Sequence, residues 1–160
     1  MKKRSSYRPR SIIRDPIGYV IKGMSPMTPQ QILNCSLQHH DALYRMTHGE
    51  ASMADWQLVC HMINTSVALS QTLFDGAYLD DLKAAMVAHA SAGRRKLDGK
   101  GLAYTGAELT AVNTALAIND EQIKLATMQE IGVAIRVVDE AHRQKNFYAS
   151  VMQGRGVATA

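Results

Sequence analysis

Residues 52–74 read SMADWQLVCHMINTSVALSQTLF, and this stretch decides the fold class. Ser52 and Asp55 stand three residues apart, as in a capping box that begins a helix. The residues that follow at steps of three and four, the spacing of one helical face, are Trp56, Val59, Cys60, Ile63, Val67, Ser70 and Phe74. The stretch therefore predicts an amphipathic helix in which Trp56 is buried at the start of the apolar face.

A second helix is predicted over 28–49. Thr28 supplies the N-cap, Pro29 takes the first helical position, Gln31 completes a capping box, and Gly49 is the expected end. A single apolar face is expected along this helix, formed by Ile32, Leu33, Leu37, His40, Leu43 and Tyr44 or Met46.

The second half of the chain contains three further helical segments. A helix is predicted over about 77–92, with Gly93 as its end and a flexible basic loop over 94–101 after it. Thr105 begins the next helix in another capping box, and Thr127 begins the last. No segment shows the two-residue alternation of a strand. The sequence therefore predicts an all-α protein, a small antiparallel bundle of four to five helices with an extended basic N-terminal arm.

The distribution of charge and proline divides the chain into three parts. Seven of the 18 Lys and Arg residues lie within 1–22 beside one acidic residue, whereas the other 138 residues hold 11 basic and 13 acidic ones. Three of the four prolines lie within 1–27, where they disfavour helix. We predict a basic, Pro-containing arm over 1–27, a helical bundle domain over 28–147 and a flexible C-terminal tail over 148–160.

The arm also contains apolar residues, and no targeting signal is apparent. Its apolar side chains are too many for a free tail, so segment 11–24 is expected to pack against helices of its own chain or of a second copy. No apolar run follows the basic start as a signal peptide requires, and none reaches the roughly 18 residues of a membrane span. We therefore expect a cytoplasmic protein without membrane contact.

The residue types that carry chemistry do not form a known motif. Cys35 and His39 share a helix face and Cys60 precedes His61, yet neither pair has the CxxC or HExxH spacing of a metal site. His39 and His40 point about 100° apart on a helix, so they do not easily share a site. The sequence holds no nucleophile elbow, P-loop or Gly-x-Gly-x-x-Gly motif. It therefore predicts no enzyme, no catalytic or metal-binding residue and no cofactor.

The basic arm is the most informative feature for binding. Its cations, interleaved with a tyrosine, can neutralise phosphates and stack on a base, contact an acidic protein surface, or stay solvated as an aid to solubility. Basic residues of the 94–100 loop would extend this surface if the loop lay on the same face. The candidate binding residues are Lys2, Lys3, Arg4, Tyr7, Arg8, Arg10, Arg94, Arg95, Lys96 and Lys100.

A set of short stretches in the first half of the chain forms a recognisable pattern. They are YRPR at 7–10, DP at 15–16, YV at 19–20, GM at 23–24, Pro26, HDAL at 40–43, GEA at 49–51 and Asp55. With these residues the chain resembles, to about residue 75, uncharacterised small proteins of prophages and other mobile elements of Gram-negative bacteria. The resemblance implies a setting, that of a phage or mobile-element accessory protein, and assigns no role to any residue.

Two functions remain open at this point. The first is a non-enzymatic accessory or regulatory protein of a phage or mobile element that binds a host or phage protein, or a second copy of itself. It is favoured because the chain beyond the arm is near neutral, and its first two predicted helices offer Met, Tyr and His rather than cations. The alternative is a nucleic-acid-binding regulator that uses the basic N-terminal arm and the 94–100 loop.

Overall fold

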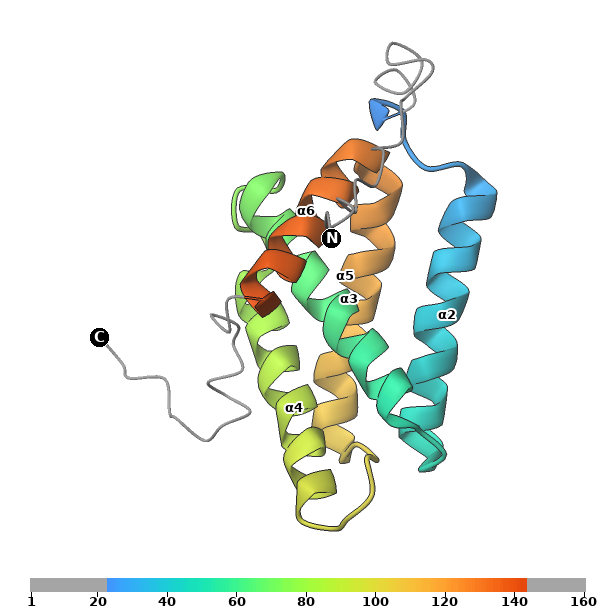
Figure 1. The fold of residues 1–160 in the computed structure, drawn as a ribbon, viewed down its shortest axis with the longest axis vertical. Helices are drawn as coiled ribbons and strands as arrows, with labels where there is room; N and C mark the ends of the chain where they lie inside the picture. The colour runs from blue at the N-terminus through green and yellow to red at the C-terminus, as the bar shows by residue number, and fades with distance from the viewer. Residues whose placement is uncertain (1–22, 144–160) are drawn as a thin grey trace, which may run out of the picture.

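The structure, a computed structural model, describes residues 23–143 as a bundle of helices. The helices are α2 (Pro29–His48), α3 (Met53–Thr72), α4 (Leu79–Leu97), α5 (Gly106–Leu125) and α6 (Met128–Arg143). Each runs antiparallel to the helix before it (Figure 1), and residues 23–143 contain no strand. The prediction of a small, antiparallel all-α bundle is therefore confirmed. The predicted tail over 148–160, and the arm up to residue 22, lie outside the described residues.

Local side chains fix where the helices begin, as the sequence predicted. At the start of α2, the Thr28 hydroxyl accepts from the Gln31 amide at 3.3 Å, and the Gln31 side chain accepts from the Thr28 amide at 2.8 Å. Ser52 and Thr105 cap α3 and α5 with the same reciprocal bonds. These caps satisfy backbone N–H groups that have no partner inside a helix. Gly49 ends α2 in the left-handed conformation, with a φ of 76°.

Helix α4 extends further than the sequence predicted. Gly93 was expected to end it, but Gly93 lies buried inside the helix, which continues to Leu97. The segment 94–97 is therefore the last turn of α4 and not part of a flexible loop. Its basic residues favour helix because cations are stabilised beside the partial negative charge of a helix C-terminus. The left-handed turn that ends the helix comes at Gly99, with a φ of 77°.

Helix α3 is the centre of the bundle. It contacts α2, α4, α5 and α6, and every residue from Met62 to Ser70 is buried. Trp56 is buried as predicted, together with Val59, Ile63 and Val67. The prediction that α3 buries a single apolar face is incomplete, because the surrounding helices also cover its other sides between Met62 and Ser70. Phe74 lies beyond the end of the helix and is partly buried.

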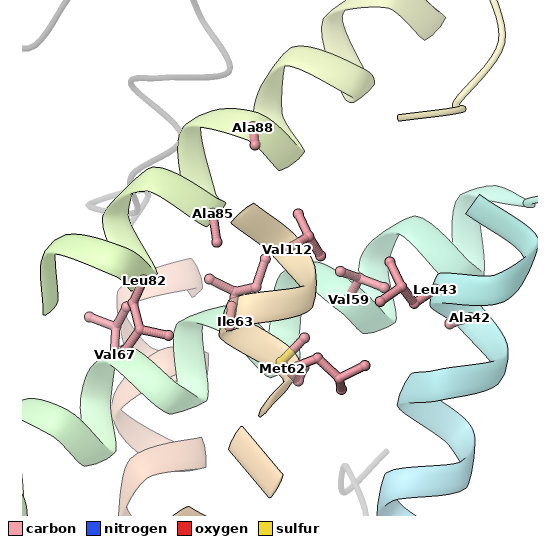
Figure 2. Close-up of a cluster of buried hydrophobic side chains, with 12 residues drawn as sticks. Ala42, Leu43, Val59, Met62, Ile63, Val67, Leu82, Ala85, Ala88 and Val112 are labelled. Carbon is pink, nitrogen blue, oxygen red and sulfur yellow. The ribbon is translucent and has the colours of Figure 1, made fainter. Parts of the chain in front are cut away.

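The apolar core forms around α3 and joins four helices (Figure 2). The labelled side chains come from α2 (Ala42, Leu43), α3 (Val59, Met62, Ile63, Val67), α4 (Leu82, Ala85, Ala88) and α5 (Val112). A second cluster attaches α6 to the far end of α3 through Leu69, Ala126, Ala134 and Val138. The small alanines on α4 and α6 allow these helices to approach α3 closely.

A row of polar side chains lies inside the bundle between α3 and α5. The Asn119 amide donates to the Ser66 hydroxyl at 2.9 Å, and the Gln122 amide donates to the Ser70 hydroxyl at 2.8 Å and to the Ser66 carbonyl at 3.2 Å. All four residues are buried. Because the bonds need matching positions on the two helices, this row fixes the axial register of α5 against α3.

Replacement of Trp56 tests the central position of α3. Trp56→Ala should lower the free energy of unfolding by about 3–5 kcal/mol, because it removes a large buried side chain and leaves a cavity. Met53→Ala, at an exposed position of the same helix, should change it by less than about 0.5 kcal/mol. Urea unfolding followed by circular dichroism measures both. Native tryptophan emission at the wavelength of a fully exposed indole would contradict the burial of Trp56.

Candidate functional site

The solvent-facing side of α2 carries an apolar stripe. Leu33, Leu37 and Tyr44 are 51%, 57% and 57% exposed. At about 100° per residue, the three side chains lie within roughly 40° of one another around the helix axis. The side of α2 that packs into the bundle holds other residues, namely His39, Ala42, Leu43 and Met46. Helix α2 lies at the edge of the bundle (Figure 1), so its second apolar side has no partner among the described residues.

We call Leu33, Leu37, Tyr44 and His48 the outer α2 face. The rings of Tyr44 and His48 stack with centroids 3.9 Å apart, and the His48 imidazole donates to the Tyr44 carbonyl at 2.8 Å. Stacking restricts the rotamers of both rings, so less entropy is lost when a partner covers them. The face therefore combines two exposed leucines with a pre-ordered aromatic pair.

The single apolar face predicted for this helix is therefore wrong. Leu43 and Met46 are buried, whereas Leu33, Leu37 and Tyr44 face solvent. The sequence does contain the signal that separates them, since Leu33 and Met46 differ by roughly 220° around a helical projection. Steps of three or four residues turn the helix by about 300° or 400°, so each step shifts the side-chain direction by about 60° or 40°. These shifts accumulate along the helix, so residues joined by such steps can lie on different faces.

A polar contact joins α2 to α5 beside the outer α2 face. The Asp120 carboxylate accepts from the Ser36 hydroxyl at 2.8 Å, and its other oxygen lies 2.9 Å from His40 Nε2. In a nucleophilic triad the histidine lies between the hydroxyl and the acid, so that it can take the proton. Here the acid lies between the other two residues. This arrangement holds two helices together and does not activate Ser36.

The two cysteines, Cys35 and Cys60, and the buried His39 are not activated for catalysis either. Burial raises the pKa of Cys35, and it raises the pKa of Cys60 to about 11, so both thiols are protonated near neutral pH and are weak nucleophiles. His39 is buried, and burial lowers its pKa, which keeps its imidazole neutral. Within residues 23–143 no group of three or more His, Cys, Asp or Glu side chains is placed to hold a metal ion.

A second histidine is buried where α3, α4 and the chain before α5 meet. The His89 ring stacks on Trp56 with centroids 4.8 Å apart, and Nε2 lies 2.9 Å from the Trp56 carbonyl. Because a carbonyl only accepts, Nε2 carries the hydrogen, and Nδ1 accepts from the Tyr104 hydroxyl at 2.6 Å. Burial lowers the pKa of His89 to about 4. With both ring nitrogens bonded inside the protein, His89 is a structural link and is not open to a substrate.

The structure describes four of the ten residues predicted to bind a partner. Arg94, Lys96 and Lys100 are exposed at and just beyond the end of α4. The Arg95 guanidinium instead donates to both carboxylate oxygens of Glu108, at 2.7 and 2.6 Å, and to the Ala103 carbonyl at 2.8 Å. Arg95 therefore links α4 to α5 and adds little to the exposed basic surface. The other six, Lys2, Lys3, Arg4, Tyr7, Arg8 and Arg10, lie outside the described residues.

Comparison with known proteins gives no relative. No family model matches the chain, and no match was found among curated proteins or solved structures. Among the helices that the structure describes, none combines the length and apolar character needed to cross a membrane.

Acid should destabilise the fold through His89. Its folded pKa of about 4 lies below the ordinary value of 6.5, so its contribution is complete above pH 6.5 and is lost as the pH falls towards 4. We expect this residue to account for about 2 kcal/mol of lost stability between pH 7 and pH 5, with a further loss from His39. Urea unfolding at several pH values should show a shallower pH slope for His89→Gln than for wild type. Identical slopes for His89→Gln and wild type would refute the assignment.

Among the basic residues at the end of α4, we expect Arg95 to contribute to stability and the exposed ones to contribute little. Arg95→Gln should cost about 2 kcal/mol, because it breaks charge-assisted hydrogen bonds to a half-buried carboxylate. The triple variant Arg94→Gln, Lys96→Gln, Lys100→Gln should unfold at nearly the wild-type temperature, since exposed charges contribute little to stability. Thermal unfolding followed by circular dichroism compares the two. Equal destabilisation by both variants would contradict the structural role of Arg95.

Proposed function

We propose that this chain is a small, non-enzymatic accessory protein of a phage or mobile element that acts in the cytoplasm by binding another protein through the outer α2 face. The observation that carries the proposal is the exposure of Leu33, Leu37 and Tyr44 on one side of a helix whose opposite side is already packed. Exposed apolar patches with polar surroundings are typical of interaction sites. The phage or mobile-element setting rests on the resemblance of the first half of the chain.

The chemistry of the outer α2 face favours a protein over a nucleic acid. Arg45 is the only Lys or Arg between residues 29 and 48, and its guanidinium binds the carboxylates of Asp41 and Asp55. The face therefore offers no free Lys or Arg to phosphate, which is the group that dominates nucleic-acid affinity. Leucines beside an aromatic ring match the apolar centre of protein interfaces. A partner with an apolar groove or helix fits this surface best.

The alternative of nucleic-acid binding has its own surface. Arg94, Lys96 and Lys100 are exposed at and just beyond the end of α4, and α4 lies across the bundle from α2 (Figure 1). Their number is small, because Arg95 is engaged with Glu108. If these residues and the cations of the N-terminal arm bound a nucleic acid, the affinity would fall steeply with salt.

The test compares one variant of the outer α2 face with a control substitution at another exposed apolar position. The double variant Leu33→Glu, Leu37→Glu places charge in the outer α2 face, and Val87→Glu makes the same change at an exposed position of α4. A protein captured from bacterial lysate, identified and purified, is titrated against all forms. We expect the double variant to bind about 30-fold more weakly, the loss of about 2 kcal/mol typical of an interface hot spot, and Val87→Glu to bind as wild type.

Two results would overturn the proposal. One is a capture that nuclease abolishes and that the Arg94→Gln, Lys96→Gln, Lys100→Gln variant loses, because it would assign the function to nucleic acid. The other is wild-type affinity of the Leu33→Glu, Leu37→Glu variant for the purified partner. Circular dichroism must show that each variant retains the helical fold, which we expect because all the substituted positions are exposed.

A further inference from the structure

The segment that precedes α2 is attached to the start of α6, and the first turn of α2 lies beside it, with Gln31 Nε2 3.9 Å from Met128 Sδ. The Met128 amide donates to the Ser25 carbonyl at 3.0 Å, and Pro26 forms an isolated antiparallel bridge with Thr127. Figure 1 shows this segment passing over the beginning of α6 before it reaches α2. These contacts fix the point at which the chain preceding Gly23 enters the bundle.

A hollow opens at this entry point, between the end of α3 and the first turns of α6. Its volume is ≈ 380 Å³, and it is lined by Met24, Thr72, Leu73, Thr127, Gln129, Glu130 and Val133. Met24 and Val133 are exposed there, and Val137 continues the apolar surface one turn further along α6. The volume lies within the range of sites that hold a ligand or several side chains. An apolar strip therefore starts at Met24 and follows α6.

The chain preceding Gly23 has the composition to cover this strip. Half of the residues in segment 11–22 are apolar, namely Ile12, Ile13, Ile17, Tyr19, Val20 and Ile21. Its net charge is +1, from Arg14 and Lys22 against Asp15, and Glu130 is the only charged residue that lines the hollow. Burial of such a segment removes apolar area from water on both sides of the contact.

Length and attachment favour this segment over any other occupant. Twelve residues reach about 40 Å when extended, whereas the 16 residues of α6 span about 24 Å. The segment can therefore follow α6 beyond Val137. Because it is attached beside the hollow at Gly23, its effective concentration there is in the millimolar range, well above that of a second copy at micromolar concentration.

We propose that residues 11–22 dock on their own chain, in the hollow beside Met24 and along the apolar strip of α6 that contains Val133 and Val137. The contact is a different surface from the outer α2 face, so this proposal does not depend on the function proposed above. It gives the apolar half of the N-terminal arm a site of its own, separate from the basic residues that precede it.

Paramagnetic relaxation tests the contact in the full chain. A nitroxide attached at Ile17→Cys should broaden the methyl signals of Val133 and Val137 and leave those of Leu97, at the far end of α4, unchanged. Wild-type protein treated with the same reagent controls for reaction at Cys35 and Cys60, which are partly buried. The broadening should persist on dilution. Its absence at Val133 and Val137 would overturn the proposal.

A mixing experiment separates the intramolecular contact from pairing of two copies. Nitroxide-labelled chains without isotope are mixed with isotope-labelled chains without nitroxide. Intramolecular docking predicts no broadening at Val133 or Val137 in the mixture. Broadening of these signals in the mixture would show that a second copy is the occupant, and it would refute docking within one chain.

Limited trypsin digestion gives an independent measure. Val133→Asp, Val137→Asp should speed cleavage after Arg14 and Lys22 about tenfold, because proteolysis follows the population of the open form, and it should leave cleavage after Arg10 unchanged. The matched control Leu33→Asp, Leu37→Asp should cleave at wild-type rates after all three residues. Unchanged rates in the α6 variant, with its helical signal intact, would sink the proposal.

Discussion

The enclosure of α3 on every side is the constraint on which the rest of the structure depends. Nine consecutive positions of this helix, Met62 to Ser70, are buried, and several of them are polar. A buried polar group without a hydrogen bond costs about 1–3 kcal/mol, so the partners that Ser66 and Ser70 find on a neighbouring helix stabilise one arrangement, although the buried Thr65 hydroxyl has none among the described residues. Helix α5 supplies these partners only in the register that places Asn119 against Ser66 and Gln122 against Ser70. Apolar packing brings the helices together, and these bonds select one arrangement among those that bury similar area.

The same constraint explains why α2 is the helix with a second apolar side. Helix α4 is bonded to α3 through His89 and to α5 through the ion pair of Arg95 with Glu108. Polar contacts therefore hold α4 to two different helices. Helix α2 packs on α3 and α5 at the edge of the bundle. Its polar links, such as His40 to Asp120, also face those two helices. Leu33 and Leu37 contribute little to that packing, so folding does not explain two exposed leucines there, and their exposure is the basis of the proposed binding role.

The sequence predicts this fold wherever the deciding contacts are local. Capping boxes join residues three positions apart, and those at Thr28, Ser52 and Thr105 form as expected. The predicted end of α4 at Gly93 was wrong, because a glycine ends a helix only where the chain adopts the left-handed conformation. Gly93 lies within the helix. Contacts between distant residues leave no local pattern. The pairing of Ser66 with Asn119 spans 53 positions: Asn119 interrupts the apolar positions of its helix, but nothing in the sequence near it identifies Ser66 as its partner. The outer α2 face lay within reach of prediction, since the angle between Leu33 and Met46 follows from helix geometry alone.

The division of charge and apolar surface implies different physical roles for the parts of this chain. Under the proposed function, the cations concentrated in residues 2–10 would act over distance: they would raise the rate at which an acidic partner is encountered and lose this effect as salt screens them. The exposed leucines of α2 would act only on contact, so in the proposed complex they would govern how slowly the partner leaves. Burial of segment 11–22 along α6 would shorten the free part of the arm to its cations. The basic residues would then extend from a fixed point on α6. A partner bound at α2 would be attracted by their positive charge without the entropy cost of ordering the whole arm. When the charges and the apolar face lie on separate elements, substitutions can change the association rate and the dissociation rate independently. In a single mixed patch, one substitution would change both rates.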